Sequence, residues 1–313
     1  MIGWPPPVRP VARLALAAVL VLASAAPGRA DGTLSVCLDR ASPALAKDGE
    51  GAQGFDLATG RALAQRLGRS LVVQPYESET DNDSNPARQV NALLSDGRCQ
   101  LVLGYPLFAG MLDRPQEQRS RLPGFDGARP GDRRRWVQLS ALAASRGLRF
   151  APLVVVLGPG AAGREVRSLA DLKPLKLGSE ERTLPDAVLM AYGGGTLISR
   201  VTHMLPGPEL FAGLERGDYD AAIVELQRFD LHRSQHPGTR LQSSGHYHSI
   251  GFNIGAIGLA SDAPLMAEVD AAINEMLANG ELAALARAAG LTWLPPREPN
   301  VSTAITWAQL RGD

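Results

Sequence analysis

The sequence predicts an α/β protein in which parallel-dominated sheets are covered by helices. Three observations support this fold class. Short apolar runs alternate with segments of helical periodicity, the links between them are short, and the alternation resumes in the second half of the chain after an arginine-rich interruption. Strands that alternate with helices over short links form parallel sheets with both faces covered. We therefore expect two α/β units, each with its own sheet.

Residues 1–30 are predicted to be a signal peptide. Arg9 and Arg13 precede an uncharged apolar run that ends in small residues. The run is shorter than the ~20 apolar residues that a membrane-spanning helix needs. Cleavage is expected after Ala30 or, alternatively, after Ala25. No cysteine follows either position, so no lipid anchor is expected.

The charge balance of the predicted mature chain is slightly acidic. The whole chain has 32 basic and 32 acidic residues, and the signal peptide contains three arginines and no acid, so 32 minus 3 leaves 29 basic residues and a net charge of −3. This balance disfavours nucleic acid as a partner. The remaining length suffices for one large domain or for two lobes with their own cores.

The only two cysteines are Cys37 and Cys99. Export to an oxidising compartment favours a disulfide between them. Register argues against it, because Cys37 lies near the end of one strand-like run and Cys99 at the start of another. In parallel neighbours with aligned ends, the sulfurs would be staggered by several residues of ~3.3 Å each. The sequence leaves a disulfide and two buried free cysteines as equal alternatives.

The first unit is predicted to contain three strands and two helices. Apolar runs at residues 34–38, 71–74 and 99–105 are typical of strands. Residues 54–68 have apolar side chains at helical spacing and end in a glycine that can adopt the left-handed conformation. Residues 85–97 begin with an asparagine and a proline, which favour a helix start.

Residues 111–136 interrupt this alternation. They contain seven arginines and four acids. We interpret them as a long surface excursion of the first lobe. A solvated loop is favoured over a surface that docks on an acidic partner.

The second unit repeats the pattern. Residues 151–157 form an apolar strand, Ser168 caps a short helix, and another strand leads to a helix that starts at Thr183. A further helix, a glycine stop and a strand ending at Glu225 follow. From Ser249 the chain is strand-like again.

The C-terminal region is predicted to be helical up to its tail. Residues 265–291 have the pattern of two helices divided at Gly280. The tail from Pro295 has no firm pattern.

Motifs for catalysis, metal binding and cofactor binding are missing from the sequence. None of the five histidines lies in an HExxH pair or beside a GxSxG elbow. His246 and His248 alternate on an extended segment but lack a third ligand. The segment "DNDSNP" begins like a calcium loop, yet Pro86 replaces the turn glycine and Ala92 stands where a glutamate is required. The glycines around Gly158 lack the lysine of a phosphate-binding loop. We expect no catalytic residue, metal or cofactor.

Polar and aromatic residues at strand ends and helix starts indicate a ligand-binding cleft. In open parallel sheets, ligands bind at the carboxyl ends of the strands, where helix N-termini present free amide donors. The candidate ligand-binding residues are Asp39, Arg40, Phe55, Asp56, Tyr105, Arg182, Thr183 and Glu225. The structural alternative is that Asp56 and Thr183 stabilise helix starts and that Phe55 is a core residue.

The order of the segments resembles the periplasmic solute-binding proteins of family 3, the type II binding proteins of polar amino acid and related ABC importers. The segments that carry the resemblance span nearly the whole mature chain: "LSVCLD", "GFDLATGRALAQRLG", "VNALLSDGRCQLVLG", "SLADLKPLKLGSEE", "LFAGLERGDYDAAIVE" and "VDAAINEMLANGELAALARAAGL". The resemblance implies a periplasmic, non-enzymatic protein that binds a small polar ligand and docks on an ABC permease.

The resemblance also implies a domain organisation. Residues 31–148 and 149–251 would form two lobes, and residues 252–313 would return to the first lobe. The crossings between lobes are expected near Arg149 and Gly251. Ligand would close the lobes by a hinge motion.

The chain departs from the amino acid binders of this family. These usually follow the third strand with a threonine and with an arginine that clamps the ligand carboxylate. The present chain reads "GYPLFAGMLDRP" there, so the clamp is missing unless Arg114 substitutes, and Glu225 stands where an aspartate is frequent.

Two further resemblances give alternative functions. The cysteine-containing segments resemble a branch of the same fold associated with periplasmic quinoprotein alcohol and methanol dehydrogenases, although its aromatic and arginine-rich stretch before the second helix is not found. That branch implies a non-transport accessory protein whose partner is the PQQ-dependent dehydrogenase or a cytochrome c. The fold also resembles cyclohexadienyl dehydratases, but no positioned acid or carboxylate clamp is identified. A fold alone does not fix which of these functions applies.

Overall fold

The structure is a computed structural model of the 313-residue chain. It describes residues 1, 3, 32–40, 54–78, 85–112 and 118–312. Most of the predicted signal peptide with its cleavage sites, most of the calcium-like segment, and Arg114 lie outside these residues.

One nine-stranded sheet runs through the molecule. In spatial order its strands are β5 (Gly124–Phe125), β2 (Ser70–Glu77), β1 (Thr33–Asp39), β3 (Leu101–Pro106), β11 (Gln242–Leu259), β7 (Leu142–Leu157), β10 (Ala221–Glu225), β8 (Leu177–Glu180) and β9 (Val201–Met204). β1 pairs in parallel with β2 and β3, and β8 pairs in parallel with β9 and β10. The predicted α/β class is confirmed, but the two expected sheets are joined into one, because β7 and β11 pair with each other between the two sets of parallel strands.

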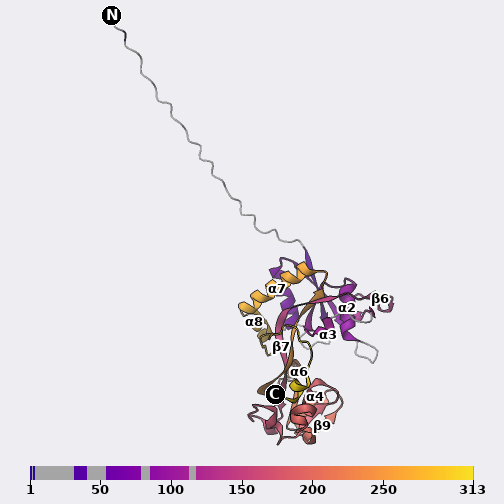
Figure 1. The fold of residues 1–313 in the computed structure, drawn as a ribbon, viewed down its shortest axis with the longest axis vertical. Helices are drawn as coiled ribbons and strands as arrows, with labels where there is room; N and C mark the ends of the chain where they lie inside the picture. The colour runs from indigo at the N-terminus through magenta and orange to yellow at the C-terminus, as the bar shows by residue number, and fades with distance from the viewer. Residues whose placement is uncertain (2, 4–31, 41–53, 79–84, 113–117, 313) are drawn as a thin grey trace.

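Helices divide between two parts of the molecule. The first part, built on β1 to β3, carries α1 (Phe55–Arg66), α2 (Pro86–Ser95), α7 (Ala263–Ala278) and α8 (Glu281–Ala288), and the second part, built on β8 to β10, carries α4 (Leu184–Ala191), α5 (Glu209–Arg216) and α6 (Leu226–Gln235). Figure 1 shows the first part above and the second part below, with β7 passing between them. The remaining short elements are α3 (Ala109–Leu112), α9 (Trp307–Arg311) and the 3₁₀ turns η1 (Asp132–Arg134), η2 (Pro159–Ala161), η3 (Leu169–Leu172), η4 (Tyr192–Gly194) and η5 (Ile198–Arg200). Within the described residues, every helix is too short or too polar to cross a membrane.

The two long strands β7 and β11 connect the parts. They pair with each other in antiparallel register along most of their length. At one end β11 pairs with β3 over residues 254–257, and at the other end β7 pairs with β10 over residues 153–157. The sheet therefore passes from the first part to the second next to Arg149 and Gly251.

Strand β1 shows how the sequence builds the core. Successive side chains of a strand point to opposite faces of the sheet. Val36 packs with Phe55 and Met266 in one buried cluster, whereas Cys37 packs with Leu93 in another. A strand covered by helices on both faces needs an apolar centre, and residues 36–38 of β1 are apolar and buried, while Thr33, Ser35 and Asp39 are not fully buried.

Cys37 and Cys99 form a disulfide, with their Cα atoms 5.6 Å apart. The parallel register places Val102, not Cys99, opposite Cys37. However, the chain bends at Gln100 before β3 begins, and this bend carries Cys99 back over β1. The inference from register that the sulfurs lie beyond bonding reach is therefore wrong.

The arginine-rich segment is only partly a surface excursion. β4 (Arg119–Arg121) pairs with β6 (Trp136–Gln138) in a separate two-stranded sheet, and β5 pairs with the end of β2. Leu122 is buried in the same cluster as Val137 and Leu139. The expectation of a long loop is corrected, because these apolar side chains anchor the segment to the core.

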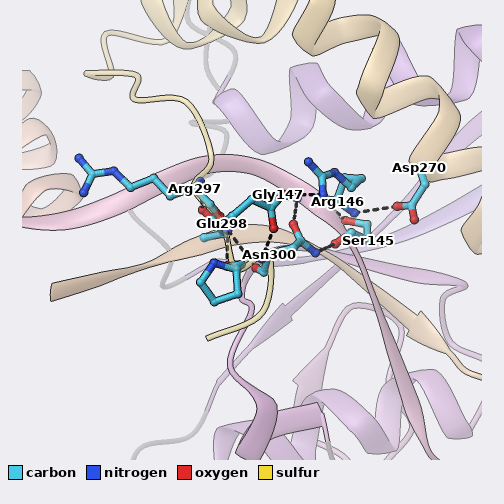
Figure 2. A network of polar contacts seen from close by, with 9 residues as sticks. Ser145, Arg146, Gly147, Asp270, Arg297, Glu298 and Asn300 are labelled. Atoms are coloured by element: carbon cyan, nitrogen blue, oxygen red, sulfur yellow. Dashed lines mark hydrogen bonds and ion pairs between the residues drawn. The ribbon is translucent and has the colours of Figure 1, made fainter. Parts of the chain in front are cut away.

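The C-terminal strap, residues 292–302, binds both long strands (Figure 2). The side chain of Asn253 on β11 donates to the carbonyl of Arg297 at 2.7 Å and accepts from its amide at 2.9 Å. The side chain of Asn300 accepts from the amide of Gly147 on β7 at 2.8 Å. The sequence shows no pattern here because the strap is held by side chains distant in sequence.

The end of the chain packs on the second part. α9 contacts α4 and β11, and Leu310 packs against the buried cluster that contains Val188. Residues 252–313 were expected to return to the first lobe as a whole. α7 and α8 do pack there, on β7 and α1, whereas α9 lies with the second part.

Candidate functional site

A cleft lies where the two parts meet. It has a volume of about 420 Å³. Its lining residues are Gly104, Pro106, Ala151, Leu153, Leu184, Glu225, Gln227, Arg228, Gly251, Phe252 and Ile254. They come from the end of β3, the middle of β7 and β11, the end of β10, and the first turns of α4 and α6. Strand ends and helix starts thus converge there, as the sequence analysis predicts for a binding cleft.

At two glycines of the cleft lining, neighbouring side chains lie too close to leave room for a Cβ atom. Gly104 has a φ of +73°, and a Cβ at this position would lie 2.4 Å from Oδ2 of Asp56. A Cβ on Gly251 would lie 2.6 Å from the ring of Phe150. Larger residues would clash at both positions, so the close approach of the strands requires glycine.

The polar wall of the cleft comes from the start of α6. Arg228 donates to Oε1 of Glu180 at 2.6 Å and to the carbonyl of Gly207 at 2.9 Å. This bonding raises the pKa of Arg228, so its charge is matched by the buried carboxylate. Glu225 forms no hydrogen bond or ion pair through its carboxylate with another described residue, but this carboxylate also attracts the guanidinium of Arg228 electrostatically. Among the described residues, the hydrogen-bonding capacity of Glu225 is thus unused.

Two buried charged side chains lie behind the cleft. Asp56 is 1% exposed, and burial raises its pKa to about 6, partly offset by Arg149. Arg149 is 3% exposed, and burial lowers its pKa against the attraction of Asp56 and Asp230. Arg149 also donates to Oε1 of Gln227 at 3.1 Å. It thereby links α1 of the first part electrostatically to α6 of the second.

Of the eight predicted site residues, Glu225 alone lines the described cleft. Asp56 lies behind Gly104. Phe55 is fully buried in the core, with the guanidinium of Arg149 5.6 Å from its ring centre, and Tyr105 is buried with its hydroxyl unpartnered. The ligand-binding roles of these residues stay predictions.

The other four predicted residues have partners or positions outside this lining. Asp39 accepts a hydrogen bond from Ser78 at 2.5 Å, and Arg40 pairs with Asp126 at the surface. Arg182 is exposed with a φ of +62°. Thr183 caps α4 by accepting from the amide of Asp186, which is its structural role.

Several residues of this region are not among those predicted from the sequence. Gln227 and Arg228 directly follow Glu225, so the rule that ligands lie at strand ends and helix starts could have included them. Phe252 and Leu184 lie in apolar runs that give no sign of a cleft. Arg149 is one of two arginines in β7, with Arg146, and no sequence feature marks it as the buried one.

The two histidines considered as metal ligands lie in different environments. His248 is buried and accepts a hydrogen bond from the amide of Ile250, while its other ring nitrogen contacts the carbonyl of Gly312 at 3.2 Å. Nε2 of His246 is buried without a partner. The described residues contain no group of three or more His, Cys, Asp or Glu side chains that could hold a metal ion.

Comparison with known proteins identifies the fold. No family model and no curated protein matches the sequence. The L-cystine solute receptor of Neisseria gonorrhoeae in its unliganded open conformation aligns over 84% of this chain and 95% of its own, with a TM-score of 0.56 and 19% identity. Substrate binding domain 2 of Lactococcus lactis GlnP in its open conformation aligns over 84% and 96%, with a TM-score of 0.60 and 13% identity.

A third structure, an ancestral cationic amino acid solute binding protein, covers 82% of this chain and 94% of its own, with a TM-score of 0.53 and 16% identity. These similarities show that the chain has the two-lobed type II periplasmic binding fold. The first and second parts described above correspond to two lobes, and the cleft lies between them.

Proposed function

We propose that the chain is a periplasmic solute-binding protein that captures a small polar ligand between its lobes and delivers it to an ABC importer. The observation that carries the proposal is the cleft of about 420 Å³ at the junction of the lobes. Sites for small molecules typically have volumes of roughly 300–1,000 Å³ and apolar walls with a few polar groups. The binding role of the structurally similar proteins supports the same function.

The lining indicates the character of the ligand. Ala151, Leu153, Leu184, Phe252 and Ile254 give the cleft an apolar wall. The guanidinium of Arg228 is hydrogen-bonded to Glu180, whereas the carboxylate of Glu225 attracts Arg228 only through space and accepts no hydrogen bond from a described residue. A ligand with an apolar body and a hydrogen-bond donor or positive charge at one end fits this wall better than an anion.

The two long strands provide the hinge of the proposed mechanism. Only β7, β11 and the C-terminal strap need to pass between the lobes, because the other sheet strands lie wholly within one of them. Closure around a ligand would bring the start of α6 towards the end of β3 and exclude water from both. An importer then distinguishes the loaded, closed form from the open form.

A thermal-shift screen tests this function. The purified chain lacking residues 1–30 would be heated with amino acids, amines, small organic acids and sugars, one at a time. A ligand that binds only the folded state raises the melting temperature in proportion to its saturation of the site. We expect at least one saturable shift. A screen without any shift would remove the support for transport.

A second candidate function is that of a non-transport accessory protein of a periplasmic quinoprotein dehydrogenase. The disulfide between Cys37 and Cys99 favours it, because the paired cysteines carry the resemblance to that branch of the fold. Stable co-purification with a quinoprotein dehydrogenase or a cytochrome c, together with no small-molecule shift, would support this function over transport. The dehydratase resemblance has no such observation in its favour.

A further inference from the structure

The arginine ribbon, formed by β4 and β6, is a two-stranded sheet at the edge of the first lobe. Figure 1 shows β6 at the outer margin of this lobe, beside α2 and away from β7. Arg119 lies opposite Gln138, Ser120 opposite Val137, and Arg121 opposite Trp136. The ribbon shares no lining residue with the cleft.

One face of the ribbon is fixed to the core. Val137, in the middle of β6, is 6% exposed and packs in the buried cluster that contains Leu93 of α2. Because side chains alternate along a strand, the neighbours of Val137 and Ser120 point to the other face. Arg119, Arg121, Trp136 and Gln138 are all exposed. The register therefore presents two arginines and a tryptophan together on the outward face.

The two arginines of this face lie beside uncharged groups of the described residues. The guanidinium of Arg121 lies 5.1 Å from the ring centre of Trp136, and Nε of Arg119 donates to the amide oxygen of Gln138 at 3.4 Å. Neither arginine forms an ion pair with a carboxylate of the described residues. Trp136 is 58% exposed.

Nearby arginines differ in this respect. Arg135 pairs with Asp96, and Arg40 pairs with Asp126. Carboxylates are thus present in this region, but they form ion pairs with arginines outside the ribbon. Within the part of the chain that the structure describes, the ribbon exposes two adjacent positive charges and a large aromatic side chain, on a predicted mature chain whose net charge is negative.

We propose that the arginine ribbon is a docking surface for an acidic segment of a partner protein. Arg119 and Arg121 are two residues apart on one strand, so they are spaced by roughly 6–7 Å, which matches alternate carboxylates of an extended chain. Arginine binds carboxylates through a bidentate fork. Tryptophan and arginine are also the side chains that dominate the binding energy of protein interfaces.

The surroundings of the ribbon favour a narrow protein segment over a membrane surface. The neighbouring carboxylates lie beside other arginines: Asp126 beside Arg40, Asp96 beside Arg135, and Asp132 beside Arg98. The face with Arg119 and Arg121 is narrow, because β4 and β6 have three residues each. An extended acidic segment matches a face of this width, whereas binding to an anionic membrane depends on a cluster of several basic side chains.

The test measures binding of a fluorescein-labelled peptide of alternating glutamate and alanine to the chain lacking residues 1–30, by fluorescence anisotropy at low salt. The double variant Arg119→Glu, Arg121→Glu is compared with the control Arg164→Glu, Arg200→Glu, which changes the net charge equally at exposed sites elsewhere. We expect about a tenfold or greater loss of affinity in the ribbon variant and less than about a twofold loss in the control. Trp136→Ala should weaken binding by about threefold.

Three results would overturn the proposal. The first is no binding of the peptide by the unchanged chain, and the second is an equal loss in both double variants, which would indicate unspecific charge attraction. The third is preferential binding to phosphatidylglycerol vesicles that the ribbon variant abolishes, which would assign the face to a membrane. Circular dichroism and melting temperatures confirm that the variants are folded. The proposal stands or falls independently of ligand binding in the cleft.

Discussion

The carboxylate of Asp56 and the guanidinium of Arg149 attract each other behind the cleft without forming a hydrogen bond. Oδ1 of Asp56 and Nε of Arg149 are both buried, and neither atom has a partner. Burial of a carboxylate without hydrogen bonds destabilises its charged form more than the attraction of Arg149 stabilises it. The pKa of Asp56 is accordingly raised to about 6.

The raised pKa of Asp56 predicts a specific pH dependence of stability. The ordinary value is 3.8, so between about pH 4 and pH 6 the folded state binds more protons at this residue than the unfolded state. The stabilisation of the folded state by the proton on Asp56 is fully present below pH 4 and is lost as the pH rises through 6. A shift of this size corresponds to about 3 kcal/mol.

Asp56→Asn should remove this contribution. Free energies of unfolding from urea titrations at several pH values between 4 and 7 would measure the difference between the variant and the unchanged chain. As the pH rises, we expect the free energy of unfolding of the variant to increase relative to that of the unchanged chain, because only the unchanged chain must bury a charged side chain at this position. Parallel curves would contradict the raised pKa.

Gly104→Ala should destabilise the protein through Asp56. The left-handed backbone costs any residue with a Cβ about 1 kcal/mol, and the clash with the carboxylate adds to this. The double variant with Asp56→Ala should lose the clash but retain the backbone cost. A double-mutant cycle on urea unfolding measures the coupling, and additive effects would show that the two residues are not in contact.

Loss of the disulfide should destabilise the first lobe. The cysteines are 62 residues apart in sequence, and a crosslink over such a loop contributes about 2–4 kcal/mol. Cys37→Ala with Cys99→Ala should lower the free energy of unfolding by this amount. Reducing agent should destabilise the unchanged chain but not the double variant. Equal stabilities in the absence of reductant would contradict the bond.

The C-terminal strap should contribute strongly to stability. Asn253 is 2% exposed and bonds to the strap through both its donor and its acceptor. Asn253→Ala leaves these backbone groups unsatisfied and should cost about 2–4 kcal/mol. The control Asn274→Ala, at an exposed position of α7, should change stability by less than about 0.5 kcal/mol. If both substitutions changed the free energy of unfolding by similar amounts, the hydrogen bonds between Asn253 and the strap would not contribute to stability as proposed.

Local signals in the sequence predicted many elements correctly. α1 begins at Phe55 and is followed by Gly68 with a φ of +65°, Asn85 caps α2, and Thr183 caps α4. Each of these features depends on residues close in sequence, whose conformational preferences act without tertiary contacts.

Features that depend on distant residues could not be predicted in the same way. The disulfide requires a bend at Gln100 that no nearby residue specifies, and the strap is ordered by Asn253 and by its own Asn300. In the cleft, the position of Glu225 at the end of a strand was sufficient to predict that it lines the cleft. The burial of Asp56 and Arg149 depends on the packing of α1, β7 and α6, and hydrophobic periodicity within one segment does not predict such packing.

The central claim is that a small solute binds between the lobes against Glu225. Isothermal titration calorimetry with the strongest ligand from the thermal screen tests it, comparing the unchanged chain with Glu225→Gln and with the surface control Glu165→Gln. A bond to a charged group contributes about 1.5–3 kcal/mol, so we expect Glu225→Gln to weaken binding by about tenfold or more and the control to bind like the unchanged chain. Unchanged affinity in Glu225→Gln would contradict the account.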